Sequence, residues 1–222
     1  MMNEKIILIG DSAFAEIAYE YFTHDSPYEV IGFSVEREYL RKNSLMGFPV
    51  YPLEELGNHV ELKGLGFHCA VVYTQLNRLR ARLINTAIEM GLTPVSYVSS
   101  GAFIWPNVKL GEHVFIFEDN TLQPFVEVGN NVVLWSGNHI GHHSTIADNV
   151  FIASQAVISG FTTIGEFSFV GVNATISNNV DIASDNWIGL GATITRSTEP
   201  NQLFKGEGSK PSPVSSTTFF KV

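Results

Sequence analysis

Three of the seven histidines in this chain lie within one short segment, NHIGHHST, and they are the first candidates for chemistry. They are His139, His142 and His143. An imidazole changes its charge near neutral pH, so it can take a proton from an attacking nucleophile. The segment therefore predicts a general base at His142, with His143 as the neighbour that orients His142 or touches the substrate.

Two other interpretations of this segment stay open from the sequence. Histidine is a common metal ligand, but no acidic or thiol side chain accompanies the three imidazoles within the segment, so we expect no metal. The histidines could also be surface residues without a function. Their clustering in a stretch that is otherwise poor in histidine favours a function.

The histidines lie inside a six-residue repeat that runs from Ile104 to Ile194. Every sixth residue over this range is Ile, Leu or Val, without a slip in register. A helix repeats near 3.6 residues and a strand near 2, so neither explains a period of six. The period is typical of a parallel β-helix, in which each repeat is one short strand plus a corner. No repeat can fold alone, because only its neighbours cover its apolar face.

Three repeats make one coil of the predicted prism, so residues eighteen apart stack on one another. Ile140 points inward, which leaves His142 and His143 near a corner, pointing outward. Gly160 lies one coil above His142, and Pro124 lies one coil below. Because Gly160 has no side chain, a backbone N–H beside the imidazole can stabilise an oxyanion. A base next to such a donor is what acyl transfer requires.

Residues 1–97 alternate strand-like and helix-like stretches, which predicts a small parallel α/β domain of the Rossmann-like class. We expect strands at residues 5–9, 28–35, 68–74 and 94–98, and helices at 13–22 and 79–91. Ligands of such sheets bind beyond the carboxyl ends of the strands. The residues that these ends bring to one crevice are Gly10, Ser12, Ala13, Phe14, Ser34, Val35, Glu36, Thr74 and Asn77.

The turn GDSAFAE at residues 10–16 is a weak dinucleotide signature, because Ala13 stands where a second glycine is expected. A helix N-terminus can still hold phosphate through its backbone N–H groups. Binding of NAD and a purely structural cap are the alternatives that the sequence leaves open for this domain.

Composition argues against several partners. The net charge is −9, and residues 102–198 hold only Lys109 and Arg196 as cations, so we expect neither nucleic acid nor anionic lipid as a partner. Cys69 is the single cysteine; it permits no intrachain disulfide, and we expect a buried residue. No apolar run resembles a signal peptide or a membrane span, which predicts a soluble, cytoplasmic protein without membrane contact.

We therefore expect three parts: an α/β domain over residues 1–97, a prism over 98–199, and an irregular tail over 200–222 that is rich in Pro, Gly and Ser. Outward aromatic residues on the prism would form an apolar patch that is rare on monomers, which predicts a homotrimer. These residues are Phe115, Phe117, Phe125, Trp135 and Trp187.

A small α/β domain followed by a hexapeptide prism with GHHSTIADNVFIASQAVISG resembles the bacterial nucleotide-amino-sugar N-acetyltransferases and the related sialic-acid O-acetyltransferases. The resemblance covers nearly the whole chain, including SYVSS before the prism and LNRLR at residues 76–80. It implies a left-handed β-helix, although parallel crossovers are usually right-handed. It also implies that the first domain binds a nucleotide sugar, and that acetyl-CoA binds between the subunits of a trimer.

The resemblance also implies roles for particular residues. The catalytic histidine of the family falls on His142, and its oxyanion-binding amide falls on Gly160. The implied acetyl-CoA contacts are Phe151, Gly160, Val172, Gly189, Leu190 and, as the cation at the phosphate end, Lys205. Arg80 of LNRLR joins the expected substrate-binding residues.

The chain departs from the family at three places. Many relatives carry Asp or Glu directly after the catalytic histidine, where this chain has His143. Either Glu118 or Asp119 of an adjoining subunit takes the role of that carboxylate, or none does. Ala13–Phe14 replaces the common glycine–histidine turn, and Phe151 replaces a residue that is polar in some relatives.

These observations predict an acetyl-CoA-dependent N-acetyltransferase in surface-polysaccharide or glycan precursor synthesis. The expected substrate is a dTDP-, UDP- or GDP-linked amino-deoxy sugar, specifically a 4-amino-4,6-dideoxy sugar, whose amine attacks directly without an acyl-enzyme. Two alternatives are a sugar O-acetyltransferase of the same fold and a non-catalytic scaffold that binds a nucleotide sugar.

Overall fold

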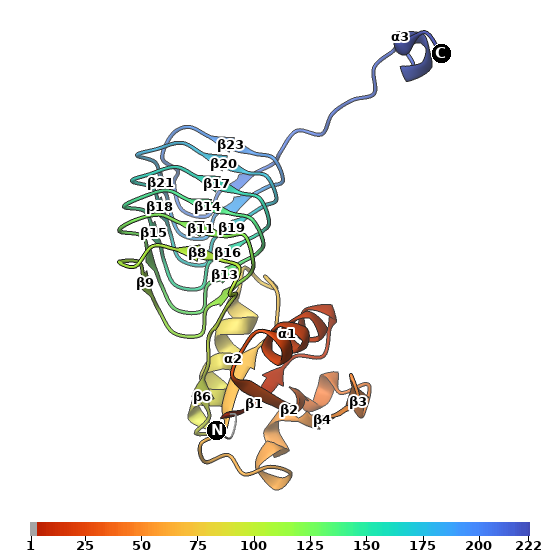
Figure 1. Ribbon diagram of the computed structural model, residues 1–222, viewed down its shortest axis with the longest axis vertical. Coiled ribbons are helices and arrows are strands. Elements are labelled where there is room, and N and C mark those ends of the chain that lie inside the picture. The colour runs from red at the N-terminus through yellow and green to blue at the C-terminus, as the bar shows by residue number, and fades with distance from the viewer. Residues whose placement is uncertain (1–3) are drawn as a thin grey trace.

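A computed structural model describes residues 4–222, in which a small α/β domain is followed by a triangular prism of parallel strands and a C-terminal arm (Figure 1). The N-terminal domain holds one six-stranded sheet in the order β3-β4-β2-β1-β5-β6. Its strands are β1 (Glu4–Ile9), β2 (Tyr28–Val35), β3 (Ser44–Leu45), β4 (Phe48–Pro52), β5 (Gly66–Cys69) and β6 (Thr93–Pro94). Its helices are α1 (Ala13–His24), α2 (Arg78–Glu89) and two 3₁₀ helices, η1 (Arg37–Tyr39) and η2 (Leu53–Asn58).

The N-terminal sheet is parallel except at its edge, where β3 runs antiparallel to β4. The central strand β1 has Ile6 to Ile9 buried on both faces, which is why it reads as a continuous apolar run. Helix α1 packs on one face through Phe14, Ala15, Ala18 and Phe22. Helix α2 packs on the other face through Leu83, Ile84 and Ala87.

Two predicted strands differ from those observed. The strand expected over residues 68–74 ends at Cys69, and the chain then leaves the sheet as a loop in which Gln75, Leu76 and Asn77 all have left-handed φ angles of 55°, 48° and 66°. The strand expected over residues 94–98 is two strands. Only β6 belongs to the first sheet, because Tyr97 pairs with Phe115 in the prism and donates a hydrogen bond to Asp25 at 2.6 Å.

The prism has three parallel sheets, named sheets I, II and III here. Sheet I contains β7 (Tyr97–Val98), β10 (Phe115–Ile116), β13 (Val133–Leu134), β16 (Phe151–Ile152), β19 (Phe169–Val170), β22 (Trp187–Ile188) and β24 (Leu203–Phe204). Sheet II contains β8 (Phe103–Ile104), β11 (Thr121–Leu122), β14 (His139–Ile140), β17 (Val157–Ile158), β20 (Thr175–Ile176) and β23 (Thr193–Ile194). Sheet III contains β9 (Lys109–Leu110), β12 (Glu127–Val128), β15 (Thr145–Ile146), β18 (Thr163–Ile164) and β21 (Asp181–Ile182).

The second residue of each prism strand points inward, as the six-residue repeat predicts. Leu122, Ile140, Ile158 and Ile176 stack in register and are all fully buried. Each full burial of such a side chain contributes about 1.5–3 kcal/mol before the loss of conformational entropy is counted. The chain turns from sheet I to sheet II at corner I–II, from sheet II to sheet III at corner II–III, and from sheet III to sheet I at corner III–I.

The outward aromatic residues of sheet I are covered by the chain's own N-terminal domain. Phe115 and Phe117 are buried, with the Phe115 ring 5.5 Å from Phe14 and the Phe117 ring 4.9 Å from Tyr21, both in α1. Trp135 joins the same cluster. Within one chain, α1 and Tyr73 thus already cover much of the patch from which the homotrimer was predicted, and Tyr73 is the residue that packs on Trp187. Of the predicted patch, Phe125 is the residue that stays 54% exposed.

The tail begins as part of the prism. Strand β24 pairs with β22 and adds a strand to sheet I, so the expected irregular segment contains regular structure. Beyond it the chain extends away from the prism and ends in a short helix, α3 (Ser216–Phe220), whose Phe219 and Phe220 are exposed (Figure 1). None of the helices within residues 4–222 is both long and apolar enough to cross a membrane.

Candidate active site

His142 and His143 occupy corner II–III, directly after β14, and both are exposed. The backbone N–H of His142 donates a hydrogen bond to Gln123 Oε1 at 3.0 Å, which ties this corner to the coil below. Gly141 lets the coil above approach closely, because a Cβ at this position would lie 2.5 Å from the Gly160 nitrogen. The corner is thus held in place from both sides while its imidazoles point to solvent.

The His142 ring lies against Gly160. A Cβ on Gly160 would meet the imidazole Cε1 at 2.9 Å and Nε2 at 3.0 Å, so glycine is the residue that leaves room for this ring position. Among residues 4–222, no group accepts a hydrogen bond from the Gly160 N–H, and none is bonded to His142 Nε2. The Gly160 N–H and His142 Nε2, both without a hydrogen-bond partner among residues 4–222, therefore belong to two residues in direct contact at this corner.

His143 contacts His142 and is sandwiched between two phenyl rings. The two Nδ1 atoms of the histidines lie 3.1 Å apart, within hydrogen-bond distance. The His143 ring stacks on Phe125 at 4.5 Å and on Phe161 at 4.8 Å, one coil below and one coil above. His139 lies outside this group, on the outer face of sheet II between Thr121 and Val157.

Neither expected carboxylate reaches His142 within the chain. Glu118 and Asp119 lie at corner I–II, and Glu118 Oε2 accepts a hydrogen bond from the Tyr21 hydroxyl at 2.6 Å. Partial burial raises the pKa of Glu118, but hydrogen bonds from Ser136 and Tyr21 outweigh it and hold the pKa below its usual range. In one copy of the chain, His143 is therefore the group that accompanies His142 at Nδ1.

The crevice predicted in the N-terminal domain is present as a pocket of about 470 Å³ at the carboxyl ends of β1, β2 and β5. It brings together five of the predicted residues, Gly10, Ser12, Val35, Glu36 and Thr74. The remaining lining residues are Ile9, Asp11, Tyr39, Val71, Gln75, Leu79, Arg82 and Leu83. Gly10 is needed at its tight turn, because it has a φ of 130° and a Cβ there would lie 2.7 Å from the Ala70 carbonyl oxygen.

Charged residues at this crevice were missed from the sequence. Arg82 donates two hydrogen bonds to the Glu36 carboxylate, at 2.6 and 2.9 Å, and these hydrogen bonds lower the pKa of Glu36. Lys42 Nζ donates to the Asp11 carbonyl oxygen at 2.7 Å, beside the start of α1. The helical spacing of Leu79, Arg82 and Leu83 was a signal for Arg82, whereas Lys42 follows an irregular stretch that gave none.

Four residues predicted for the crevice are buried elsewhere, and each has a structural partner. Ser34 donates to the Tyr51 carbonyl oxygen at 3.2 Å, and Phe14 packs between α1 and sheet I. Asn77 donates to the Ser168 carbonyl oxygen in the prism at 3.4 Å. Arg80 is fully buried between the two domains, and burial lowers its pKa to about 10. It donates to Asn131 Oδ1 at 2.7 Å and to the Asn131 carbonyl oxygen at 2.9 Å, so its role is to join the domains.

Ala13 is the remaining predicted residue of the crevice. It is exposed at the start of α1 but does not line the pocket.

The residues implied for acetyl-CoA fall into separate groups. Val172 and Leu190 are exposed at corner I–II, one coil apart, with Gly189 beside Leu190 and packed against Lys205, whose Cα would lie 3.5 Å from a Cβ on that glycine. Gly160 lies at corner II–III instead.

Phe151, another implied contact, does not present its side chain to solvent. Its side chain is buried on sheet I with its ring 5.2 Å from Tyr73, and it also lies under the Arg80 guanidinium.

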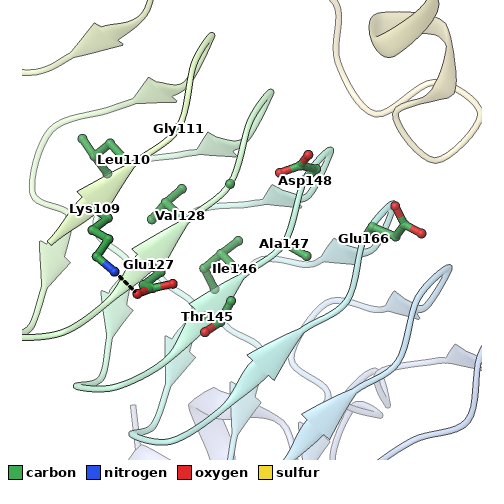
Figure 2. Close-up of a pocket in the computed structure, with 11 residues that line it drawn as sticks. Lys109, Leu110, Gly111, Glu127, Val128, Thr145, Ile146, Ala147, Asp148 and Glu166 are labelled. Carbon is green, nitrogen blue, oxygen red and sulfur yellow. Dashed lines mark hydrogen bonds and ion pairs between the residues drawn. The ribbon is translucent and has the colours of Figure 1, made fainter.

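A further hollow lies on the flat face of sheet III (Figure 2). Its single lysine, Lys109, is paired with Glu127 at 2.6 Å, and Asp148 and Glu166 add two more carboxylates. The negative balance makes this face unsuited to phosphate groups. Within residues 4–222, no three His, Cys, Asp or Glu side chains gather as a metal would require.

Comparison with known sequences supports the repeat. Residues 125–160 match the profile described as bacterial transferase hexapeptide (six repeats). No curated protein sequence gives a significant match.

Solved structures are similar along most of the chain. The acetyltransferase domain of PglB from Neisseria gonorrhoeae FA1090 is 22% identical over 95% of this chain and 100% of its own, with a TM-score of 0.81. PerB from Caulobacter crescentus, solved with CoA and GDP-perosamine, is 22% identical over 90% of this chain and 92% of its own, with a TM-score of 0.76. WeeI from Acinetobacter baumannii AYE is 20% identical over 88% of this chain and 92% of its own, with a TM-score of 0.67. These similarities confirm the predicted fold, an α/β domain followed by a left-handed β-helix of hexapeptide repeats.

Proposed function

We propose that this protein is an acetyl-CoA-dependent N-acetyltransferase that acts on the amino group of a nucleotide-linked amino-deoxy sugar. The observation that carries the proposal is the contact of the His142 ring with Gly160, because neither the imidazole Nε2 nor the Gly160 N–H has a hydrogen-bond partner among residues 4–222. Solved relatives of the fold include a domain solved with acetyl coenzyme A and a protein solved with CoA and GDP-perosamine. The substrate that we expect is a 4-amino-4,6-dideoxy sugar.

The proposed reaction uses these two groups directly. The sugar amine attacks the thioester carbonyl of acetyl-CoA, and a C–N bond forms while His142 Nε2 takes the amine proton. The Gly160 N–H donates to the oxyanion that develops on the carbonyl oxygen. The C–S bond then breaks, and the proton on His142 passes to the leaving thiolate. No acyl-enzyme forms in this scheme, because the lone thiol, Cys69, is buried in the N-terminal domain and burial raises its pKa to about 12.

The N-terminal crevice is the proposed site of the nucleotide. The amino end of α1 and the Lys42 ammonium favour the negative charge of a diphosphate. The Glu36–Arg82 pair supplies polar groups that can bond to a base or a ribose. The rim of the crevice includes a left-handed turn at Gln75, Leu76 and Asn77. Such a backbone conformation costs free energy and is of the kind found at ligand sites.

The two halves of this site belong to different copies of the chain in our proposal. A triangular prism has one corner opposite each face, and corner II–III, with His142, is opposite sheet I, which the N-terminal domain covers. A sugar held in the crevice is therefore offered to the histidine of a neighbouring copy. Exposed apolar residues on sheet II and corner II–III support this assembly as a homotrimer. They are Phe103, Trp105, Phe125, Val157 and Phe161.

The activity is tested by mixing the purified protein with acetyl-CoA and a panel of UDP-, dTDP- and GDP-linked 4-amino-4,6-dideoxy sugars, with the matching 4-hydroxy sugars as controls. Release of free CoA thiol and the mass of the sugar product report the transfer. We expect thiol release and an acetamido product with an amino sugar. Release with hydroxy sugars alone would instead indicate an O-acetyltransferase. Sugar binding without release would indicate a scaffold.

A further inference from the structure

Three aromatic rings form a continuous stack at corner II–III, in the order Phe125, His143, Phe161. All three residues have left-handed backbones, with φ angles of 66°, 58° and 57°. Such a backbone is strained for any residue except glycine, and Asn or Asp tolerates it best. The corresponding corner positions elsewhere in this prism are largely Asn and Asp, for example Asp119, Asn131, Asn149, Asn173, Asn179 and Asp185.

Burial within one chain does not account for the phenyl rings either. Phe125 and Phe161 are 54% and 53% exposed, so about half of each side chain contributes nothing to a core. Both rings contact the imidazole between them, and Phe161 also meets the His142 ring edge-on at 5.0 Å. Neither backbone preference nor burial within one chain explains the two phenylalanines. An apolar contact between copies would need no aromatic ring at these two positions, whereas holding the plane of the His143 ring does.

The plane of the His143 ring matters because it decides which nitrogen of His142 carries the proton. A neutral imidazole carries one proton, so His142 Nε2 can act as the base only if the proton is on Nδ1. That Nδ1 lies 3.1 Å from His143 Nδ1, which must then be the acceptor and leave the proton of His143 on its Nε2. A His143 ring tilted out of this plane would lose this acceptor and free His142 to place its proton on Nε2.

We propose that Phe125 and Phe161 are positioning residues, which clamp His143 so that its Nδ1 accepts the Nδ1–H of His142 and keeps His142 Nε2 free as the base. The catalytic consequence rests on the proposed function, whereas the proton positions do not. The arrangement gives His142 an oriented acceptor without a carboxylate. Its neighbours on the adjoining coils, Gln123, Pro124 and Ser159, carry no charge.

The test uses Phe125→Leu and Phe161→Leu, which remove the rings but keep an apolar side chain with the same backbone strain. Phe167→Leu is the matched control, because Phe167 has a φ of 53° at corner III–I and stacks under Arg78, away from the histidines. Phe161→Tyr keeps an aromatic ring at this position and should therefore behave as the wild type does. Light scattering checks that every variant keeps the wild-type assembly.

Two readouts are measured on each variant. Nitrogen-15 NMR of histidine-labelled protein reports which nitrogen of His142 and His143 carries the proton. We expect Nδ1–H on His142 and Nε2–H on His143 in the wild type, Phe167→Leu and Phe161→Tyr, and mixed forms in the two leucine variants at corner II–III. We also expect kcat to fall roughly 10- to 50-fold in those two variants, a part of the usual share of a general base, with the KM for acetyl-CoA within about twofold.

The outcomes separate the inference from the proposed function. A wild-type His142 protonated on Nε2, or leucine variants with unchanged spectra, would overturn the inference whatever the activity. A fall in kcat with unchanged spectra would also overturn it, since the rings would then act on the substrate and not on His143. Absence of acetyl transfer in a protein with the expected proton positions would contradict the proposed function and support the inference.

Discussion

Acid should destabilise this protein more steeply than its carboxylates alone require, because two histidines are buried in neutral form between the domains. The rings of His68, in β5, and His113, at corner III–I, are parallel within 2° and 4.2 Å apart, and both side chains are buried. His113 Nε2 accepts a hydrogen bond from the Cys69 N–H at 2.9 Å, and His68 Nδ1 bonds to the Val95 carbonyl oxygen at 2.9 Å. Burial lowers the pKa of His68 to about 4 and that of His113 well below its usual value, with the nearby Arg80 charge acting in the same direction.

The magnitude follows from linkage. In the unfolded chain both imidazoles titrate near their usual pKa of about 6.5, so below this pH the unfolded state binds protons that the folded state does not. The free energy of unfolding is therefore unaffected by this pair above about pH 7 and falls as the pH is lowered. Between pH 7 and pH 5 each histidine accounts for about 2 kcal/mol, or about 4 kcal/mol for the pair.

The assay is urea unfolding at fixed protein concentration from pH 8 to pH 5, followed by tryptophan fluorescence. We expect a loss of about 4 kcal/mol over this range in the wild type, and about half that slope in His68→Phe. His24→Asn is the control, because His24 is exposed at the end of α1 and should leave the slope unchanged. A free energy of unfolding that does not change between pH 7 and pH 5 would show that the buried pair is not linked to stability. NMR titration of the two rings near their usual pKa in the folded protein would show the same.

Three further predictions concern the site. Gly160→Ala should fold, because the two atoms nearest its Cβ are at the end of the His142 side chain and the His142 carbonyl oxygen, at 3.1 Å, needs to shift only slightly. It should lower kcat by roughly 10²–10³-fold through displacement of that ring, measured by CoA release; unchanged kcat would remove Gly160 from the site. Arg82→Ala should raise the KM for the nucleotide sugar at least about tenfold, the effect of losing about 1.4 kcal/mol of binding, and leave the KM for acetyl-CoA unchanged; a rise in both would contradict the division between the domains. Light scattering should give three times the chain mass. Mixing copies that carry Arg82→Ala with copies that carry His142→Asn should restore turnover at the wild-type KM for the nucleotide sugar, because one site then joins an intact crevice to an intact histidine; a monomer, or a mixed trimer that keeps the raised KM, would argue against a shared site.

Much of the fold was predictable because the hexapeptide repeat fixes it directly. An aliphatic residue at every sixth position permits one inward-facing register, and the observed prism has that register throughout. The helices and central strands of the first domain were also predictable from their apolar patterns. The loop after Cys69 was not, because its residues continue an apolar run in the sequence although the chain has already left the sheet, and Tyr73 packs instead on the aromatic residues of sheet I.

The site was partly predictable for the same reason. Corner geometry follows from the repeat, so the positions of His142 and Gly160 could be inferred by counting, as could those strand ends that form the crevice. Contacts between the domains could not be inferred by counting. Arg80, Phe14 and Phe151 have residue types that suit a ligand site, but all three are buried where the first domain meets sheet I.

The proposed mechanism makes His142 the base of an acetyl transfer. This role is tested by the kcat of His142→Asn, measured with acetyl-CoA and the best amino sugar of the panel. His139→Asn is the matched control on the same coil. We expect His142→Asn to keep its fold and assembly, because the inward stack is untouched, and to lose roughly 10²–10⁴-fold in kcat, the usual share of a general base, whereas His139→Asn loses much less. A kcat near that of the wild type in an intact His142→Asn assembly would show that His142 is not the base.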